Sequence, residues 1–207
     1  MYPLKLVKKN EQLSLFVPDP ALIKSTYSQL VALDSTALFP YWAKIWASSD
    51  AMVKFLRSEP KWIQNKIVLE IGAGIGMPSL NIAAQTHKVI ISDYAPDAVA
   101  LLQKNIEHLR LTNASALCID WNNVSDDVVA DTILLSDTNY ELSAHNNLIL
   151  MIDTFIKKGS TIILATPNRL ASNLFIETIS KYIYTSNNYR IIENESLIEI
   201  VVMVLKN

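Results

Sequence analysis

Cysteine and glycine are both scarce in this 207-residue chain, which has one cysteine and four glycines. The single cysteine, Cys118, excludes an internal disulfide and a zinc site built from several cysteines of one chain. We expect it to be an inert core residue. The three histidines are scattered without the spacing of metal ligands. No apolar run approaches the roughly 18–20 residues that cross a bilayer, so we expect a soluble protein.

An excess of basic charge is also lacking, since 18 lysines and arginines face 20 aspartates and glutamates. The formal net charge is -2, and no basic cluster is longer than KLVKK. Both observations disfavour nucleic acid as a partner, because its phosphates attract basic surfaces. The first twelve residues lack the apolar stretch and cleavage site of a secretory signal. We therefore expect a cytoplasmic location and no membrane partner.

Short apolar runs alternate with helical patterns from residue 66 onward. Because most of the runs are continuous, they predict parallel strands that are buried on both faces. The alternation predicts a doubly wound α/β sheet, Rossmann-like in plan. The strand runs are 66–71, 88–93, 114–120, 131–137, 160–166, 189–194 and 197–205. The main helical patterns are 78–86, 96–110 and 170–184.

The last two strand runs are joined only by the residues ENES, which are too few for a right-handed parallel crossover. They predict a C-terminal antiparallel hairpin on a seven-stranded, mostly parallel sheet. Residues 1–65 predict a β-rich start followed by helices. No linker divides the sequence, so we expect a single domain over residues 1–207. Residues 1–40 would form an N-terminal extension and residues 41–207 the core with its leading helix.

Three of the four glycines, Gly72, Gly74 and Gly76, lie within five residues after the first core strand. In an α/β fold this turn leads into a helix whose free N–H groups lie at the carboxyl edge of the sheet, where ligands bind. Glycine permits positive φ and lets a ligand approach bare backbone. The alternative is a tight strand–helix connection without a ligand. A dinucleotide fingerprint, G-x-G-x-x-G, would need glycine at position 77, which is Met77.

Acidic residues accompany three successive strand runs. Glu70 stands two residues before the first glycine, and Asp93 ends the second run, where a carboxylate can accept both hydroxyls of a ribose. Asp120 ends the third run and is followed by Trp121, which could pack on a base. Each carboxylate alone could be a solvated acid at a strand end. Three in register favour a ligand site.

An acidic residue followed by G-x-G-x-G resembles motif I of the S-adenosylmethionine-dependent methyltransferases. The stretch PYWAKIWASSDAMVKFL (40–56) and the D-x-x-Y of residues 137–140 narrow the resemblance to methyltransferase family 16, seven-β-strand enzymes that include many protein-lysine methyltransferases. The resemblance extends from residue 40 to 166. It implies the class I methyltransferase fold and S-adenosylmethionine as cofactor. The cofactor-binding residues that it implies are Trp46, Glu70, Gly72, Ala73, Gly74, Gly76, Asp93, Tyr94, Asp120 and Trp121.

The same resemblance implies that Asp137 and Tyr140 are catalytic and orient an acceptor amine. It implies an N-methyltransferase that acts on a lysine of a protein. A small-molecule N-methyltransferase and a non-catalytic cofactor-binding module are the alternatives. A nucleic-acid acceptor is disfavoured, because amino-methyltransferases of nucleic acid commonly carry N/D-P-P-Y, and both middle positions here lack proline.

Several of these residues also have simpler interpretations. Trp42 and Trp46 lie four residues apart, so a helix would place them on one face, where they could pack in the core. An aromatic face also favours a cation, and we choose Trp46 for that role. Tyr140 could be a packing residue, and Asp137 could cap the following helix. We expect His145 to lie on the surface of a helix.

Overall fold

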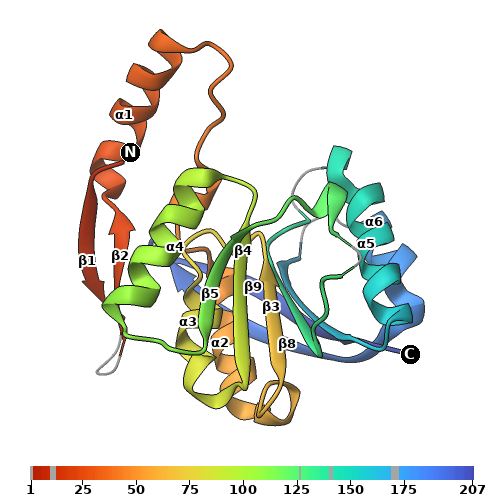
Figure 1. Ribbon diagram of the computed structural model, residues 1–207. Coiled ribbons are helices and arrows are strands. Elements are labelled where there is room, and N and C mark those ends of the chain that lie inside the picture. Colours follow the sequence, from red (N-terminus) through yellow and green to blue (C-terminus); the bar gives the residue numbers. More distant parts are fainter. Residues whose placement is uncertain (1, 10–12, 126, 140–141, 169–172) are drawn as a thin grey trace.

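The centre of the molecule is a seven-stranded sheet in the order β5-β4-β3-β6-β7-β9-β8 (Figure 1). The computed structural model describes residues 2–9, 13–125, 127–139, 142–168 and 173–207. The strands of this sheet are β3 (Ile67–Ile71), β4 (Lys88–Asp93), β5 (Ala114–Cys118), β6 (Thr132–Ser136), β7 (Thr161–Pro167), β8 (Ile183–Glu193) and β9 (Ser196–Leu205). The helices of the chain are α1 (Pro20–Leu33), α2 (Ala47–Ser58), α3 (Met77–Ile82), α4 (Pro96–His108), α5 (His145–Lys157) and α6 (Asn173–Ile179).

The predicted fold class is confirmed. Strands β3 to β7 pair in parallel, whereas β9 runs antiparallel to both β7 and β8. From β3 the chain continues outward to β4 and β5, and then returns to place β6 on the other side of β3. The strand order therefore reverses between β3 and β6. In open α/β sheets this reversal leaves a crevice at the carboxyl ends of the strands, where ligands bind.

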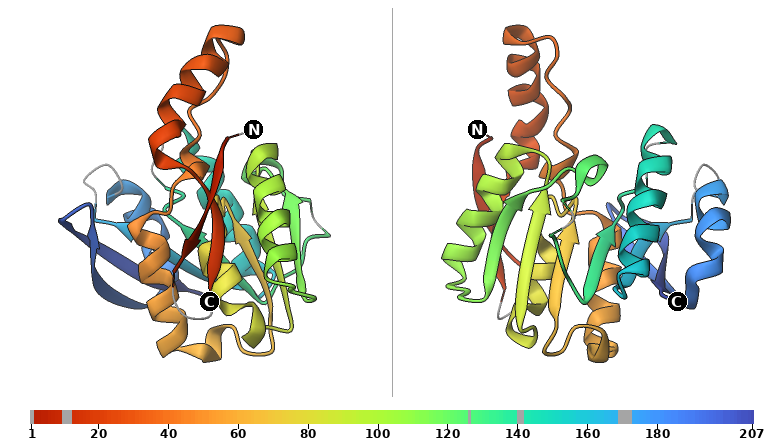
Figure 2. Two further views of the ribbon diagram at one scale, coloured as in Figure 1. Left: turned by 90° about the vertical axis from the view of Figure 1, so that its left-hand side faces the viewer. Right: turned by 45° about the vertical axis from the view of Figure 1, so that its right-hand side comes forward.

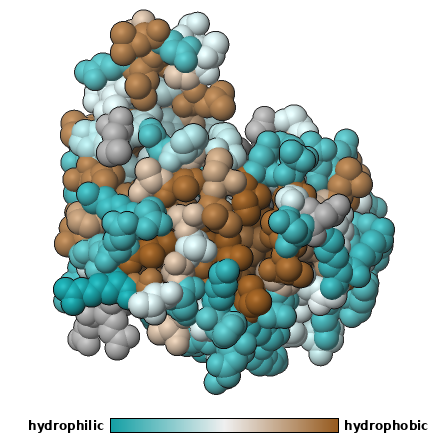
Figure 3. All heavy atoms as spheres, in the orientation of Figure 1, coloured by the Kyte–Doolittle hydropathy of each residue, from teal (hydrophilic) through white to brown (hydrophobic). Residues whose placement is uncertain are grey.

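Two apolar layers cover the two faces of the sheet. Because successive side chains of a strand point to opposite faces, Val68 packs in the layer of α2, α3 and α4, and its neighbour Leu69 packs in the layer of α5 and α6. A 3-10 turn, η4 (Trp121–Asn123), connects β5 to β6 in place of a helix. The second face therefore stays partly open over β5, where Leu117 is 44% exposed. Figure 3 shows hydrophobic side chains gathered over these strands.

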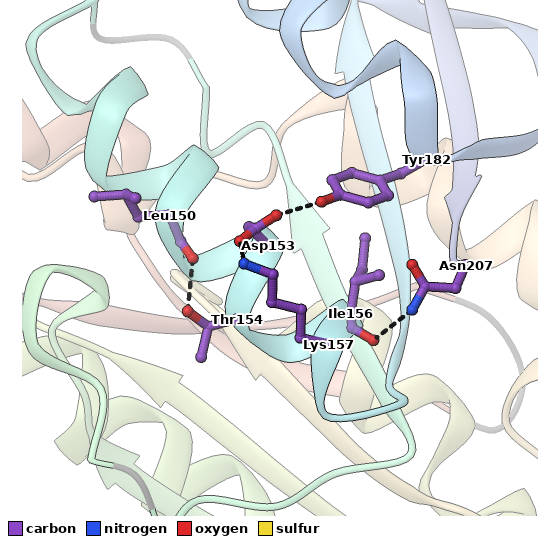
Figure 4. Close-up of polar contacts among 7 residues, drawn as sticks. All are labelled: Leu150, Asp153, Thr154, Ile156, Lys157, Tyr182 and Asn207. Atoms are coloured by element: carbon purple, nitrogen blue, oxygen red, sulfur yellow. Dashed lines mark hydrogen bonds and ion pairs between the residues drawn. The ribbon is translucent and has the colours of Figure 1, made fainter.

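Helix α5 is tied to the chain on both sides of the C-terminal hairpin (Figure 4). The Asp153 carboxylate accepts a hydrogen bond from the Tyr182 hydroxyl, just before β8, and also pairs with Lys157. Asn207, just after β9, donates from Nδ2 to the carbonyl oxygen of Ile156. These contacts fix α5 against the hairpin. No helix among the described residues is long and apolar enough to cross a membrane.

The N-terminal segment starts with a separate antiparallel hairpin, β1 (Leu4–Lys8) and β2 (Ser14–Pro18). Asn105 of α4 anchors this hairpin, because its amide accepts from the Phe16 N–H at 2.8 Å and donates to the Phe16 carbonyl oxygen at 3.1 Å. Helix α1 then projects from the body with no buried residue (Figures 1 and 2). Residues 34–46 lead back to the sheet. The predicted β-rich start followed by helices is confirmed.

The helical pattern 170–184 is confirmed in part by α6, whereas its last residues belong to a strand, and a shared helix for Trp42 and Trp46 was wrong. Strand β8 begins at Ile183, inside the helical pattern 170–184 and six residues before the predicted strand, because it pairs with β9 along its length. Trp42 and Trp46 do not share a helix face. Trp42 lies in the 3-10 turn η1 (Tyr41–Ala43), and Trp46 is the N-cap of α2.

Two predictions of burial were also wrong. Cys118 is exposed, because β5 is an edge strand of the sheet. His145 is buried at the start of α5. Its Nε2 lies 3.0 Å from the carbonyl oxygen of Asn139, and its ring packs against Phe175.

Candidate functional site

A pocket lies at the carboxyl edge of the sheet, at the reversal between β3 and β6. It is open to solvent, and its empty space of about 650 Å³ includes the solvent at its mouth. Distant parts of the chain form its wall. They are residues 41, 42, 44–46 and 49 before and in α2, residues 72–75 and 77 after β3, residues 93–94 at the end of β4, Trp121, and residues 136–138 at the end of β6.

Gly72 and Gly74 line this pocket, and both have left-handed backbones with φ of 66° and 54°. A Cβ on Gly72 would lie 3.0 Å from the ring of Trp121, and a Cβ on Gly74 would lie 2.9 Å from the carbonyl oxygen of Trp42. The missing side chains therefore admit two other segments of the same chain. The glycines predict that something lies close to the backbone of the turn, and here the protein itself does so. The contact of Trp121 with Gly72 shapes this part of the pocket wall, which also includes Ala73.

Gly76 has a different place. It is the N-cap of α3 with φ of 74°, and it does not line the pocket. A Cβ there would lie 2.4 Å from Leu102 of α4 and 3.1 Å from Ile91 of β4. Gly76 therefore packs the turn against the layer of α4 beneath it.

Glu70 lies beneath the turn, wholly buried at the end of β3, and does not line the pocket. Its Oε2 accepts a hydrogen bond from the Ser79 N–H in the first turn of α3 at 3.0 Å. Among the described residues, its Oε1 has no hydrogen-bond partner. Burial raises the pKa of Glu70 to about 7, and the bond from Ser79 opposes this rise. The carboxyl group thus holds the start of α3 against β3.

Asp93 holds the same turn from the side and also lines the pocket. Its Oδ2 accepts from the Gly74 N–H at 2.9 Å, and its Oδ1 accepts from the Ala95 N–H at 3.0 Å. Burial raises the pKa of Asp93, whereas these bonds lower it. Each carboxylate oxygen can accept a second hydrogen bond, so the group can also meet ligand hydroxyls. Tyr94, which follows, stands in the pocket wall.

Asp120 does not line the pocket. It caps η4 by accepting from the backbone N–H and the side-chain amide of Asn122 at 2.9 and 2.8 Å. It lines an adjoining hollow together with Tyr94 and Trp121, and these two aromatic residues line both cavities. Of the predicted residues, the structure brings together Trp46, Gly72, Ala73, Gly74, Asp93, Tyr94, Trp121 and Asp137. Tyr140 lies outside the described residues.

Asp137 enters the pocket directly after β6. Its backbone is left-handed with φ of 56°, and its N–H donates to the carbonyl oxygen of Ala165 at 2.8 Å. The interpretation of Asp137 as a cap of the following helix was wrong, because the N-cap of α5 is Ala144. Aspartate tolerates a left-handed backbone better than most residues, yet at some cost in energy. The left-handed backbone at Asp137 therefore ends the extended conformation of β6.

Some residues of the pocket wall were missed in the sequence. Ser136 and Thr138 flank Asp137, and the hydroxyl of the buried Thr138 has no hydrogen-bond partner in the part of the chain that the structure describes. Their position at a strand end could have identified them. The hydroxyl oxygens of Ser49 in α2 and Ser136 lie 3.2 Å apart. Ser49 and Lys44 also line the pocket. Neither carries a recognisable sequence signal.

The chemistry of the wall limits the ligand. Two carboxylates, Asp93 and Asp137, and several aromatic rings suit a ligand with a positive charge, hydroxyl groups and a flat ring system. Among the described residues of the wall, Lys44 is the one basic side chain, and it pairs with Glu193. This wall does not suit a pyrophosphate. The described residues hold no cluster of three or more histidine, cysteine or acidic side chains that could bind a metal.

Comparison with known proteins gives a consistent match. The family described as lysine methyltransferase matches residues 33–182. The chain is 30% identical over 135 residues to calmodulin-lysine N-methyltransferase of Arabidopsis thaliana, and the match covers 60% of this chain and 44% of that protein. It is 27% identical over 118 residues to histone-arginine methyltransferase METTL23 of Xenopus laevis, and this match covers 54% of this chain and 50% of that protein. The chain spans about half the length of these curated relatives.

A solved structure shows the same fold. The N-methyltransferase NodS from Bradyrhizobium japonicum, in complex with S-adenosyl-L-homocysteine, superposes with a TM-score of 0.64 at 14% identity. The match covers 88% of this chain and 99% of that chain.

The packing of Gly76 predicts a stability difference between two glycine variants. Gly76→Ala and Gly159→Ala both place alanine on a left-handed backbone, with φ of 74° and 91°. Only the Cβ at position 76 meets other atoms, because nothing lies within 4 Å at position 159. We expect Gly76→Ala to lower the free energy of unfolding by about 1–3 kcal/mol more than Gly159→Ala does, which is the cost of overpacking. Urea denaturation measures both, and equal losses would contradict this packing role.

The raised pKa of Glu70 predicts a pH dependence of stability. Its pKa of about 7 in the folded state exceeds the ordinary value of 4.5, so its contribution is greatest below pH 4.5 and is lost as the pH rises to about 7. The loss is roughly 3 kcal/mol. Glu70→Gln cannot ionise and keeps an oxygen for the Ser79 N–H. Urea denaturation at several pH values should show that the variant lacks this fall, whereas parallel pH profiles would refute the assignment.

Proposed function

The chain belongs to the lysine methyltransferase family, and from this premise we propose that it transfers a methyl group from S-adenosylmethionine to a lysine amine of a protein. The observation that carries the proposal is the meeting of Asp93, Asp137 and the glycine turn in one pocket at the strand reversal. Asp93 is an acid beside the turn, and Asp137 is the first residue after β6.

The residues of the wall fit S-adenosylmethionine, which supplies a methyl group on a positively charged sulfonium. Asp93 accepts hydrogen bonds from the ribose hydroxyls. Tyr94 and Trp121 flank the base, and Trp46 lines the same wall. Glu70, Gly76 and Asp120 act indirectly in this proposal, because they support the turn, α3 and η4 without lining the pocket.

Methyl transfer is an in-line displacement, so the chief task of the protein is to align a neutral amine with the methyl group and exclude competing water. Asp137 accepts a hydrogen bond from that amine, and its constrained backbone fixes the direction of the bond. Tyr140 is the proposed second orienting residue. No covalent intermediate with the protein is required.

The surface beside the pocket supports a protein acceptor over a small molecule. The segment from the end of α1 into η1 carries exposed apolar side chains, among them Leu38, Phe39 and Tyr41. Tyr41 also lines the pocket, so this apolar surface is continuous with its wall. A small-molecule acceptor would leave it uncovered. One relative is named a histone-arginine methyltransferase, so arginine is the alternative to lysine as the acceptor side chain.

A labelling experiment tests the acceptor class. The purified protein is incubated with S-adenosylmethionine labelled in its methyl group and with a proteome extract, and the protein, nucleic-acid and small-molecule fractions are counted. We expect label in proteins, on lysine after acid hydrolysis. Label on arginine or in small molecules would replace the proposed acceptor, and no transfer to any fraction would favour a non-catalytic module.

The cofactor proposal predicts a preference that calorimetry can measure. We expect the protein to bind S-adenosylmethionine and S-adenosylhomocysteine and to bind NAD at least tenfold more weakly, about 1.4 kcal/mol. The physical reason is that the wall offers carboxylates where a pyrophosphate needs donors, and Met77 stands at the third dinucleotide glycine. Tight binding of NAD without heat from S-adenosylmethionine would remove the central claim.

The role of Asp137 predicts a loss of turnover without a loss of cofactor. Asp137→Asn keeps the volume and tolerates the left-handed backbone, but it removes the negative charge. We expect methyl transfer to fall sharply, by tenfold or more, while S-adenosylhomocysteine binding stays within about tenfold, or 1.4 kcal/mol. Full turnover by the variant, on a substrate from the labelling experiment, would contradict the catalytic role of Asp137.

A further inference from the structure

The pocket wall holds one of the protein's own lysines against an aromatic face. Lys44 Nζ lies 4.1 Å from the ring centroid of Trp46 and 3.0 Å from Glu193 Oε1. The Trp46 ring is itself anchored, because its Nε1 donates to the carbonyl oxygen of Tyr41 at 3.1 Å. Glu193 ends β8, so the C-terminal hairpin contacts Lys44 of the pocket wall at this point.

This arrangement is a site for a lysine ammonium. An aromatic face within about 6 Å and a carboxylate at hydrogen-bond distance are the two groups that recognise such a cation in water. The Lys44 and Glu193 side chains are 41% and 23% exposed, so the contacts are partly solvated. Partly solvated contacts of this kind are individually weak, and another cation can replace the occupant.

We propose that Trp46 and Glu193 form the docking site for the lysine ammonium of the acceptor, and that Lys44 fills this site in the free protein. The proposal rests on the proposed function and names the groups that select a cationic side chain. The acceptor lysine displaces Lys44 and takes over its two contacts, next to the pocket wall where Asp137 lies. Lys44 therefore acts as a built-in competitor that lowers the apparent affinity for the acceptor.

The chain contains a matched control. Lys61 Nζ lies 5.2 Å from the ring centroid of Trp62 and 2.6 Å from Glu59 Oε2. The same three residue types thus meet on the surface, but none of them lines the pocket. Removing the Lys61 charge perturbs a similar contact away from the proposed site.

The test follows the Trp46 indole N–H signal by NMR, assigned with Trp46→Phe, during titration with N-acetyl-lysine methylamide. We expect Lys44→Met to tighten binding of this probe about three- to tenfold relative to the wild type. Lys44→Arg, which keeps a cation on the ring, should bind as the wild type does, and so should Lys61→Met. N-acetyl-norleucine methylamide, which lacks the ammonium, should leave the signal unchanged in every variant.

The carboxylate is tested in the same background. Adding Glu193→Gln to Lys44→Met should weaken probe binding about fivefold or more, because the ammonium loses its charged partner. Thermal unfolding of each variant shows whether it is folded. Unchanged probe affinity in folded Lys44→Met, or the same tightening in Lys61→Met, would overturn the proposal. No methyl transfer occurs in this titration, so a failure of the labelling experiment refutes the proposed function separately.

Discussion

At three positions of the turn between β3 and α3 no side chain fits, and the pocket depends on that restriction. Each glycine of the turn admits a different part of the chain. The Trp121 ring meets Gly72, the Trp42 carbonyl oxygen meets Gly74, and Leu102 lies against Gly76. Interiors pack too densely to absorb an extra methyl group at such distances. The glycines therefore let η4, η1 and α4 meet at one turn. The pocket is the space that remains between the turn, η1 and η4.

Two buried carboxyl groups stiffen the same turn. Glu70 holds the start of α3, and Asp93 holds the Gly74 and Ala95 N–H groups. Removing carboxylates from water raises the pKa of both groups, so the fold gives up some stability for these bonds. A turn held in this way needs little rearrangement when a ligand arrives, which is the physical basis of a preorganised site.

The sequence predicts the scaffold well because its signals are local. Continuous apolar runs mark the strands, and the short ENES link predicts the terminal hairpin. Pairing across the sheet is not local, and it overrides the end of the helical pattern 170–184 and leaves Cys118 on an edge strand. Within the site, strand-end position predicts Asp93 and Asp137. The contact between Lys44 and Glu193 could not be predicted, because only the folded sheet brings β8 beside the segment before α2.

The anchoring of the N-terminal segment also sets an order of assembly during synthesis. Residues 41–49 leave the ribosome before β3, yet Ser49 meets its partner Ser136 only after β6 has been made. Likewise, Phe16 of β2 waits for Asn105, 89 residues later in the chain. Contacts over such separations close slowly, because a long loop must be ordered first. We therefore expect residues 41–49 to take up their contacts in the pocket wall late, after the strand–helix units of the sheet have formed.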